Sequence, residues 1–259
     1  MALSETFDRV AELYDRARPR YPAQLYDDLA EVTGVGPGAR VLEIAPATGI
    51  TTVELARRGY DITAVEMGRN LAAVAHRNLE RFSRARVEVS RFEDWPIPDE
   101  PFELICCATA FSWLDPTVRA SKCAALLKPG GHLAVWDTLH VDGGTSQFFI
   151  DMQECYERWM PGTEPGLRCP GIAEANQSRY GLDRDGRFEP VAVREYPVVI
   201  AYTTETYLEV IQTYSGHIDL SAENAEGLYA CIRELMDLRY GGRIEKQYLF
   251  YLQAYRRNG

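Results

Sequence analysis

The most constraining feature of this 259-residue chain is a short apolar strand that runs directly into a turn of small residues. It occupies Arg40–Gly49, with the sequence RVLEIAPATG, and a helical pattern follows at 51–58. Seventeen residues after Gly49, a second apolar run at 62–65 ends on an acid, Glu66. This layout is typical of a nucleotide-type cofactor site at the edge of a parallel sheet. The turn approaches the ligand there, and the acid accepts hydrogen bonds from ribose hydroxyls.

The turn is irregular, because alanine stands at two positions where glycine would be expected, Ala45 and Ala47. Glycine adopts a positive φ without penalty, whereas alanine in the left-handed region costs on the order of 1 kcal/mol. An added methyl group can also clash with a ligand that lies against the turn. Two outcomes follow: the turn shifts slightly and still binds a cofactor, or the fold persists and that binding is lost.

Composition bounds the class of protein. The length suits one large α/β domain, or one domain with an inserted cap. A hydrophobic fraction of 46% and a charged fraction of 25% are those of an ordinary globular protein. The net charge of −10 argues against a large nucleic-acid interface, because phosphate binding requires a basic face.

The N-terminus has no basic start followed by an apolar stretch, and no apolar run approaches 18 residues. We therefore expect no secretory signal, no membrane span and a cytoplasmic location with reduced thiols. The six cysteines include no CxxC pair and only four histidines are present, so we expect no metal site. Cys106 and Cys107 lie inside an apolar run and are predicted to be small core residues.

From residue 40 onward, short apolar runs alternate with helical periodicity. Strands are predicted at 41–45, 61–66, 86–90, 102–108 and 132–138, and helices at 50–58, 69–82 and 116–127. The segment Lys128–Gly131 (KPGG) predicts a sharp stop before the last of these strands. The strands are continuous apolar runs, so both of their faces are buried. Right-handed crossovers then give an α/β fold with a doubly wound, mostly parallel sheet covered by helices on both sides.

The flanking segments have a different pattern. Helices are predicted at 5–15, 23–33, 148–159, 203–214 and 221–239, a loop or cap at 160–187, and strands at 191–202 and 247–255. Pro197 weakens the first of these two strands. The predicted organisation is a helical lid at 1–36, a cofactor-binding core at 37–140, and cap elements with the last strands at 141–259.

Five motifs in this order resemble those of class I S-adenosylmethionine-dependent methyltransferases: VLEIAPATG, AVE, FEDWPIP, FELICCATAFSWLDP and LLKPGGHLAVW. The opening FDRVAELYDRARPRYP looks like the branch that contains trans-aconitate methyltransferase-like and other small-molecule methyltransferases. The resemblance covers 7–140 well and 141–259 loosely. It implies a Rossmann-like seven-stranded sheet whose last strand is antiparallel and inserted beside the sixth, with an N-terminal helical lid and a C-terminal helical cap.

The resemblance implies S-adenosyl-L-methionine as cofactor and gives roles to residues near the turn. Glu43 matches the position that binds the ammonium of the methionine part, directly or through water. Glu66 matches the acid that holds the ribose hydroxyls, and Met67 matches the apolar residue against adenine. The turn under the methionine and ribose consists of Ala45, Pro46, Ala47 and Gly49.

Two further loops are implied to reach the cofactor. After the third strand, either Glu93 or Asp94 accepts a hydrogen bond from the adenine amino group, and Trp95 packs nearby. An ordinary polar loop is the alternative. Ala108 ends the fourth strand at the edge where ligands bind in doubly wound sheets, and its small side chain allows close approach to the cofactor.

The substrate side is expected to be aromatic. Phe111 and Trp113 are predicted to wall the substrate pocket, although core packing explains them equally well. Tyr14, Arg18 and Tyr21 are predicted to form a lid, with Tyr21 also on the substrate side. Arg18 suits the methionine carboxylate as a charge-assisted partner, or it is a surface arginine.

His140 follows the fifth strand and is the leading candidate for a general base, with a solvated loop histidine as the alternative. Methyl transfer places little demand on side chains, because the sulfonium is already activated and the step is an in-line displacement. A carboxylate acceptor needs no base at all. Arg168, Arg179, Arg184 and Arg187 would suit an acidic acceptor if they converged, although a solvated loop explains them as well.

The most favoured function is transfer of a methyl group to an O, N or carboxylate of a small molecule. The alternative is a methyltransferase-fold protein that no longer methylates, a binding protein or a biosynthetic cyclase, because of Ala45 and Ala47. A nicotinamide oxidoreductase would suit Glu66, but GxGxxG is absent. Neither the methyl acceptor nor the oligomeric state follows from the sequence.

Overall fold

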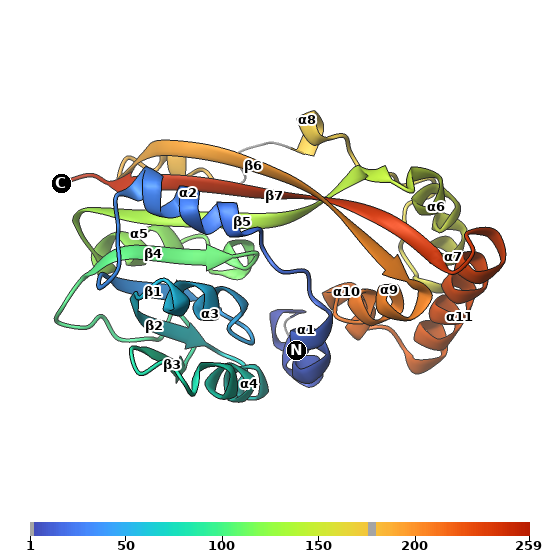
Figure 1. The fold of residues 1–259 in the computed structure, drawn as a ribbon, viewed down its shortest axis with the longest axis horizontal. Helices are drawn as coiled ribbons and strands as arrows, with labels where there is room; N and C mark the ends of the chain where they lie inside the picture. The colour runs from blue at the N-terminus through green and yellow to red at the C-terminus, as the bar shows by residue number, and fades with distance from the viewer. Residues whose placement is uncertain (1–2, 176–179) are drawn as a thin grey trace. The chain divides into compact units, whose positions relative to one another are not determined.

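The computed structural model describes residues 3–175 and 180–259 (Figure 1). They fall into two compact units. The sheet unit consists of residues 19–138, 180–196 and 250–259, and the helical unit consists of residues 3–18, 139–175 and 197–249. The lid, core and cap predicted from the sequence were defined by their expected roles in binding, and this division stays a prediction.

One sheet of seven strands has the order β3-β2-β1-β4-β5-β7-β6. The strands are β1 (Arg40–Ile44), β2 (Asp61–Glu66), β3 (Ala85–Val89), β4 (Phe102–Ala108), β5 (Leu127–Gly144), β6 (Phe188–Thr203) and β7 (Arg243–Arg257). The pairs β1–β2, β1–β4, β2–β3 and β4–β5 are parallel. Six strands are parallel and one is antiparallel, with β7 between β5 and β6, which confirms the predicted fold class.

Helices of the sheet unit follow the predicted alternation. They are α2 (Ala23–Thr33), α3 (Ile50–Arg57), α4 (Arg69–Leu79), η2 (Phe111–Trp113), α5 (Arg119–Leu126) and η3 (Leu182–Arg184). α2 coincides with its prediction: Pro22 fits the N-terminal boundary, and Gly34 ends the helix at φ 65°. α5 begins three residues later than predicted.

Helices of the helical unit are more divided than predicted. They are η1 (Leu3–Val10), α1 (Ala11–Ala17), α6 (Ser146–Asp151), α7 (Gln153–Trp159), α8 (Ile172–Ala175), α9 (Thr204–Ile211), α10 (Ser215–Ile218) and α11 (Ala222–Arg239). The single helix predicted at 5–15 begins as a 3₁₀ helix, and the one predicted at 148–159 is interrupted at Met152. Apolar periodicity marks the buried face but not the exact hydrogen-bond register.

The last three strands are longer than predicted. β5 contains the KPGG segment and begins five residues before its predicted start, whereas the stop predicted at Lys128–Gly131 agrees with the end of α5 at Leu126. Pro197 lies within β6, which is the terminal strand in the sheet order. An edge strand tolerates proline, because the N–H that proline lacks can belong to the side without a neighbour. β7 begins four residues before its predicted start.

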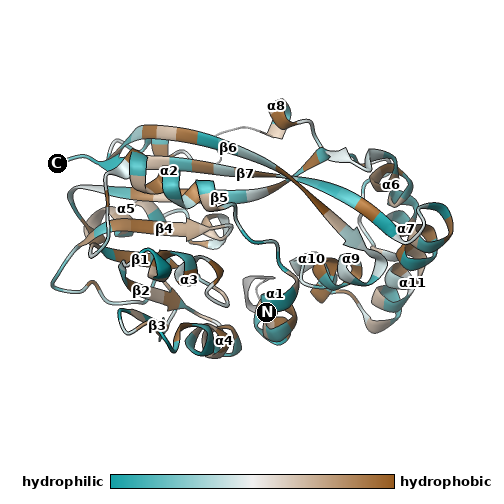
Figure 2. Cartoon of the chain, viewed as in Figure 1, coloured by the Kyte–Doolittle hydropathy of each residue, from teal (hydrophilic) through white to brown (hydrophobic). Residues whose placement is uncertain are grey.

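The core of the sheet unit consists of apolar side chains from both faces of the central strands. Leu42, Ile44 and Ile105 have no exposed surface, and Cys107 packs in the same cluster. Cys106 is buried as well, so both cysteines are core residues as predicted. Figure 2 shows β4 mostly in brown, in agreement with its continuous apolar sequence. Burial of these surfaces is the main favourable contribution to folding.

A disulfide joins Cys155 of α7 to Cys231 of α11, with a Cα–Cα distance of 5.8 Å. The sequence did not predict this pair, because 76 residues separate the two cysteines. The expectation of reduced thiols is therefore wrong for Cys155 and Cys231. Disulfides are uncommon in cytosolic proteins, and the cytoplasmic location stays a prediction. None of the helices in the described part of the chain has the length and apolarity needed to cross a bilayer.

Candidate functional site

The turn after β1 lies at the carboxyl edge of the parallel strands. Ile44 is in register with Val65 of β2 and with Cys107 of β4. The residues that follow each of these positions are Ala45, Glu66 and Ala108, and they therefore share one edge of the sheet. This is where ligands bind in open α/β sheets.

Both alanines of the turn adopt the left-handed conformation, with φ 52° at Ala45 and 51° at Ala47. Gly49 has φ 84° and immediately precedes α3. A left-handed alanine costs on the order of 1 kcal/mol relative to the right-handed form. The turn thus keeps a backbone shape that glycine adopts without strain. Such strain persists only where the surrounding structure imposes the conformation, and it is common at functional sites.

Glu66 imposes this conformation through its side chain. Its carboxylate accepts a hydrogen bond from the backbone N–H of Ala47 at 2.9 Å and another from Gly68 at 2.8 Å. The side chain is buried at 3% exposure. A carboxylate has about four acceptor positions, and these two backbone bonds occupy one on each oxygen. The role of Glu66 toward a ribose stays a prediction, whereas its role in the turn is observed.

Glu43 is a buried carboxyl group at the end of β1, with 1% of its surface exposed. Its Oε2 atom has no hydrogen-bond partner in the described structure, and the same is true of the hydroxyl of Thr48 in the adjacent turn. Burial raises the pKa of Glu43 to about 8, and the charge of Glu66 adds to this rise. A ligand cation at Oε2 would satisfy the group and favour its ionised form.

Pro46 is buried within the turn and Met67 is half-buried directly after Glu66. These positions agree with a turn beneath the ligand and an apolar residue beside its base. Their contacts with a cofactor stay predictions.

In the loop after β3, Glu93 and Asp94, the two candidates for a hydrogen bond with adenine, have different environments. The Glu93 carboxylate accepts a hydrogen bond from the backbone N–H of Asp115 at 3.0 Å, whereas the side chain of Asp94 is 74% exposed. Trp95 is buried in the core and donates from Nε1 to Glu88 at 2.7 Å. Trp95 is therefore a packing residue in this structure, and contact of any of these groups with adenine stays a prediction.

The loop after β4 contains a third left-handed residue, Thr109, at φ 55°. Its hydroxyl shares hydrogen bonds of 3.1 Å with the hydroxyl of Tyr21 and 3.3 Å with that of Thr138. The sequence identified Tyr21 but missed the two threonines, because no motif marks a β-branched residue with positive φ. Phe111 has no exposed surface and belongs to the core, which is the alternative left open above, and Trp113 is 43% exposed.

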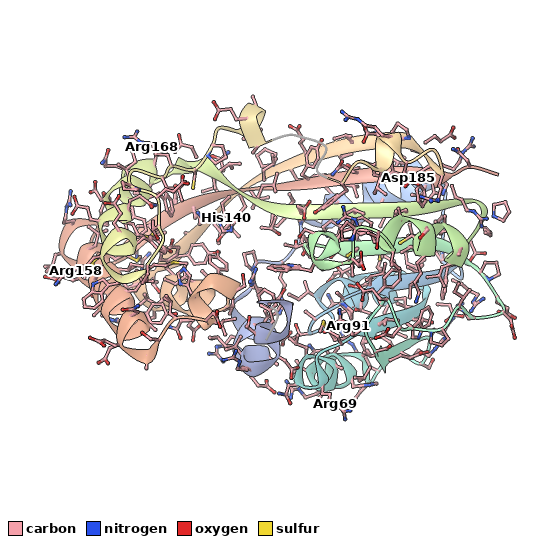
Figure 3. All side chains as sticks on the ribbon, turned by 180° about the vertical axis from the view of Figure 1, so that it is seen from behind. Arg69, Arg91, His140, Arg158, Arg168 and Asp185 are labelled. Atoms are coloured by element: carbon pink, nitrogen blue, oxygen red, sulfur yellow. A yellow bond between two sulfur atoms is a disulfide. The ribbon has the colours of Figure 1, made fainter. Side chains whose placement is uncertain are left out.

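Three predicted residues belong to the helical unit: Tyr14, Arg18 and His140. The Arg18 guanidinium donates to the Oγ1 and carbonyl oxygen of Thr213 at 2.8 and 2.6 Å, and it lies 4.8 Å from the ring centre of Tyr14. His140 is on β5, with an exposed side chain (Figure 3). Dense surrounding protein and the cations Lys246 and Arg18 lower the pKa of His140 to about 3. The imidazole is therefore neutral at pH 7. Its catalytic role stays a prediction.

The described arginines among those suggested for an acidic acceptor are divided between the two units. Arg184 and Arg187 pair with Asp183 and Asp185 in the sheet unit, whereas Arg168 is exposed in the helical unit. Arg179 lies outside the described residues. No group of three or more His, Cys, Asp or Glu in residues 3–175 and 180–259 is arranged to hold a metal ion.

Comparison with known proteins agrees with this geometry. Residues 41–131 match the family described as "Methyltransferase domain". An uncharacterized methyltransferase of Mycobacterium tuberculosis is 30% identical over 137 residues, which are 52% of this chain and 54% of the relative. The chain therefore spans about half the length of the curated relatives it matches.

Solved structures share the fold over nearly the whole chain. A putative type II methyltransferase from Anaeromyxobacter dehalogenans has a TM-score of 0.60 at 17% identity. The match covers 92% of this chain and 97% of that chain. The [4+2]-cyclase SpnF has a TM-score of 0.58 at 17% identity. The match covers 99% of this chain and 96% of that chain. At such identities the likeness shows the fold alone. The same fold occurs in a structure titled as a methyltransferase and in one titled as a cyclase.

The left-handed turn gives a stability prediction. Ala47→Gly should keep or raise the free energy of unfolding, by up to about 1 kcal/mol, because relief of strain outweighs the greater entropy of unfolded glycine. The matched control is Ala73→Gly, in the exposed interior of α4, which should lower it by about 1 kcal/mol. Urea denaturation measures both changes. Equal losses in the two variants would mean that Ala47 is not strained.

The buried carboxyl of Glu43 gives a pH prediction. Between its ordinary pKa of 4.5 and the folded value of about 8, the unfolded chain is ionised while the folded chain keeps the proton. Folding then binds a proton, so stability falls as pH rises through this window. Glu43→Gln removes this titration. The melting temperature of the variant should therefore fall less than that of the wild type between pH 6 and pH 8.5.

The matched control for this prediction is Glu103→Gln. Partial burial opposes ionisation of Glu103, but the hydrogen bond from Lys128 holds its pKa below the ordinary value. Glu103 is therefore ionised in both states above pH 6, and the control should retain the wild-type slope. Parallel pH profiles for wild type and Glu43→Gln would show that Glu43 titrates normally.

Proposed function

We propose, from the methyltransferase domain at residues 41–131 and the class I fold around it, that this chain transfers a methyl group from S-adenosyl-L-methionine to an O, N or carboxylate of a small molecule. The observation that carries the proposal is the buried Glu43 carboxyl with an unpartnered Oε2 atom. It lies directly before a left-handed turn that Glu66 holds in place. A buried acid without a partner is costly unless a ligand satisfies it.

The residues at the sheet edge fit the chemical groups of this cofactor. Glu43 would hold the ammonium of the methionine part, Glu66 the ribose hydroxyls, and Met67 the adenine face. When bound, the cofactor supplies a methyl group that its sulfonium already activates. The alanines at the turn leave the glycine-like backbone path intact, which supports binding over loss of the site.

This chain then has to position the acceptor and exclude water. Holding reacting atoms about 3–3.5 Å apart and in line supplies much of the rate enhancement in such a transfer. The hydroxyls of Tyr21, Thr109 and Thr138 form a connected polar group beyond the carboxyl end of β4, on the same sheet edge as the turn. They are suited to hydrogen-bond a polar acceptor group, with the orientation fixed by the strained backbone of Thr109.

His140 is poorly suited to act as a general base. A histidine with a pKa of about 3 is neutral at pH 7, and it is a poor base toward an alcohol or a phenol. An acceptor that is already ionised needs no proton removal. The environment of His140 therefore favours an acidic acceptor within the proposed class.

A non-methylating role is the second candidate, and the methyl groups of Ala45 and Ala47 are the observation that favours it. If they obstruct the ligand, the fold would serve a binding or cyclase-type function. Binding of the cofactor separates the two candidates.

The test is calorimetric titration with S-adenosyl-L-methionine and, separately, S-adenosylhomocysteine at pH 7. We expect both to bind with release of up to one proton, because the ligand ammonium lowers the pKa of a Glu43 that is protonated in the free protein. The binding enthalpy should therefore differ between phosphate and Tris buffers, whose ionisation enthalpies differ.

The control variant is Glu43→Gln, which should bind more weakly and lose the dependence on buffer. Binding with the same enthalpy in both buffers would remove Glu43 from contact with the ammonium. No binding of either compound to the folded protein would contradict the proposed function and favour the non-methylating candidate.

A further inference from the structure

Lys246 is unlike the other two lysines of the chain. Lys122 donates to the backbone oxygens of Glu93 and Trp95, and Lys128 pairs with Glu103 at 2.9 Å. Lys246 is 4% exposed, and no acidic group pairs with it in the parts of the chain that the structure describes. This is a buried cation without a counter-charge, although the chain has 38 acidic residues.

The contacts of Lys246 are aromatic. Its ammonium lies 4.2 Å from the ring centre of Phe149 and 5.4 Å from that of Tyr248. Cation–π contacts recover part of the lost hydration, but they do not replace hydrogen-bond acceptors. An uncompensated buried charge destabilises a fold, so its presence points to a function in binding an anion.

Hydroxyl groups and an accessible imidazole surround this position. Lys246 and Tyr248 are two residues apart on β7, and therefore point to the same face of the strand. The Tyr248 hydroxyl shares hydrogen bonds with Tyr202 at 3.1 Å and Tyr214 at 3.4 Å. The ring of His140 lies 5.2 Å from that of Tyr214 and 5.5 Å from that of Tyr248. His140, labelled in Figure 3, is exposed, whereas Lys246 and Tyr248 are buried.

A second cation lies at the same cluster. The ring of Tyr214 lies 4.9 Å from the guanidinium of Arg18, whose polar contacts in the described structure are with the oxygens of Thr213. Both Arg18 and Lys246 lower the pKa of His140, so their fields add at one imidazole. The cluster is therefore positive and aromatic within a chain of net charge −10.

We propose that Lys246, together with His140 and Tyr248, binds the carboxylate of an aromatic acid. The ammonium would pair with the carboxylate, while the tyrosine rings pack against the ring of the ligand. The role of this acid as the methyl acceptor rests on the proposed function, whereas the binding site itself does not. Aromatic rings prefer offset and edge-to-face contacts, which the tyrosines and His140 already make with one another.

The test is calorimetric titration of the full chain with benzoate, cinnamate and the neutral benzamide. We expect benzoate or cinnamate to bind the wild type and benzamide to bind at least tenfold more weakly. Lys246→Met should weaken binding of the acid at least tenfold. The matched control, Lys128→Met, removes a lysine charge in the sheet unit and should bind as the wild type does.

The melting temperature of Lys246→Met separates binding from structure. Methionine fills a similar volume among aromatic rings without a buried charge, so the variant should melt at or above the wild-type temperature. Lys246→Gln is the second variant and should also lose binding. Loss of binding in either variant, with melting unchanged or raised, supports the proposal.

Three results would overturn it: no binding of either acid to the wild type, equal binding of benzoate and benzamide, or full binding by both Lys246 variants. Titration of the same samples with S-adenosyl-L-methionine keeps the two proposals apart. Cofactor binding without acid binding rejects only the aromatic-acid site. Acid binding without cofactor binding rejects only the methyl-transfer proposal.

Discussion

The hydrogen bond from the Ala47 N–H to the Glu66 carboxylate is the interaction on which the candidate site depends. It links the turn after β1 to the end of β2 and stabilises Ala47 in a conformation that alanine avoids. The second oxygen of Glu66 accepts from Gly68, at the start of α4. One buried carboxylate thus holds the backbone of two loops at the same edge of the sheet.

Two other buried ionisable groups act against stability. Among the described residues, Glu43 in the sheet unit has an oxygen without a partner, and Lys246 in the helical unit has aromatic neighbours but no acidic one. A fold selected for stability alone would replace such groups with apolar ones or pair them. Their persistence is understandable if ligands supply the missing charges: an ammonium at Glu43 and a carboxylate at Lys246. Both proposals thus have the same physical basis.

Much of the fold could be predicted from the sequence, because continuous apolar runs and helical periodicity are local signals. β2 and β4 have their predicted bounds, and the turn clusters separate the elements correctly. The errors occur where distant contacts decide. KPGG is an irregular segment within β5, between the pairs Phe102–Leu127 and Leu104–His132, and Pro197 is tolerated because β6 is at the edge of the sheet. No local feature of the sequence indicates that Cys155 pairs with Cys231.

The sequence by itself determined the order of strands and helices, the acid at the end of β2 and the small-residue turn, since each depends on neighbours in the chain. Only the tertiary structure decided what those residues do. It bonded Glu66 to the turn, left the Oε2 atom of Glu43 without a hydrogen-bond partner among the described residues, and placed Trp95 and Phe111 in the core. It also brought Lys246 beside Tyr248 and Phe149 without an acid. Burial and pairing depend on residues far apart in the chain, and no local pattern contains that information.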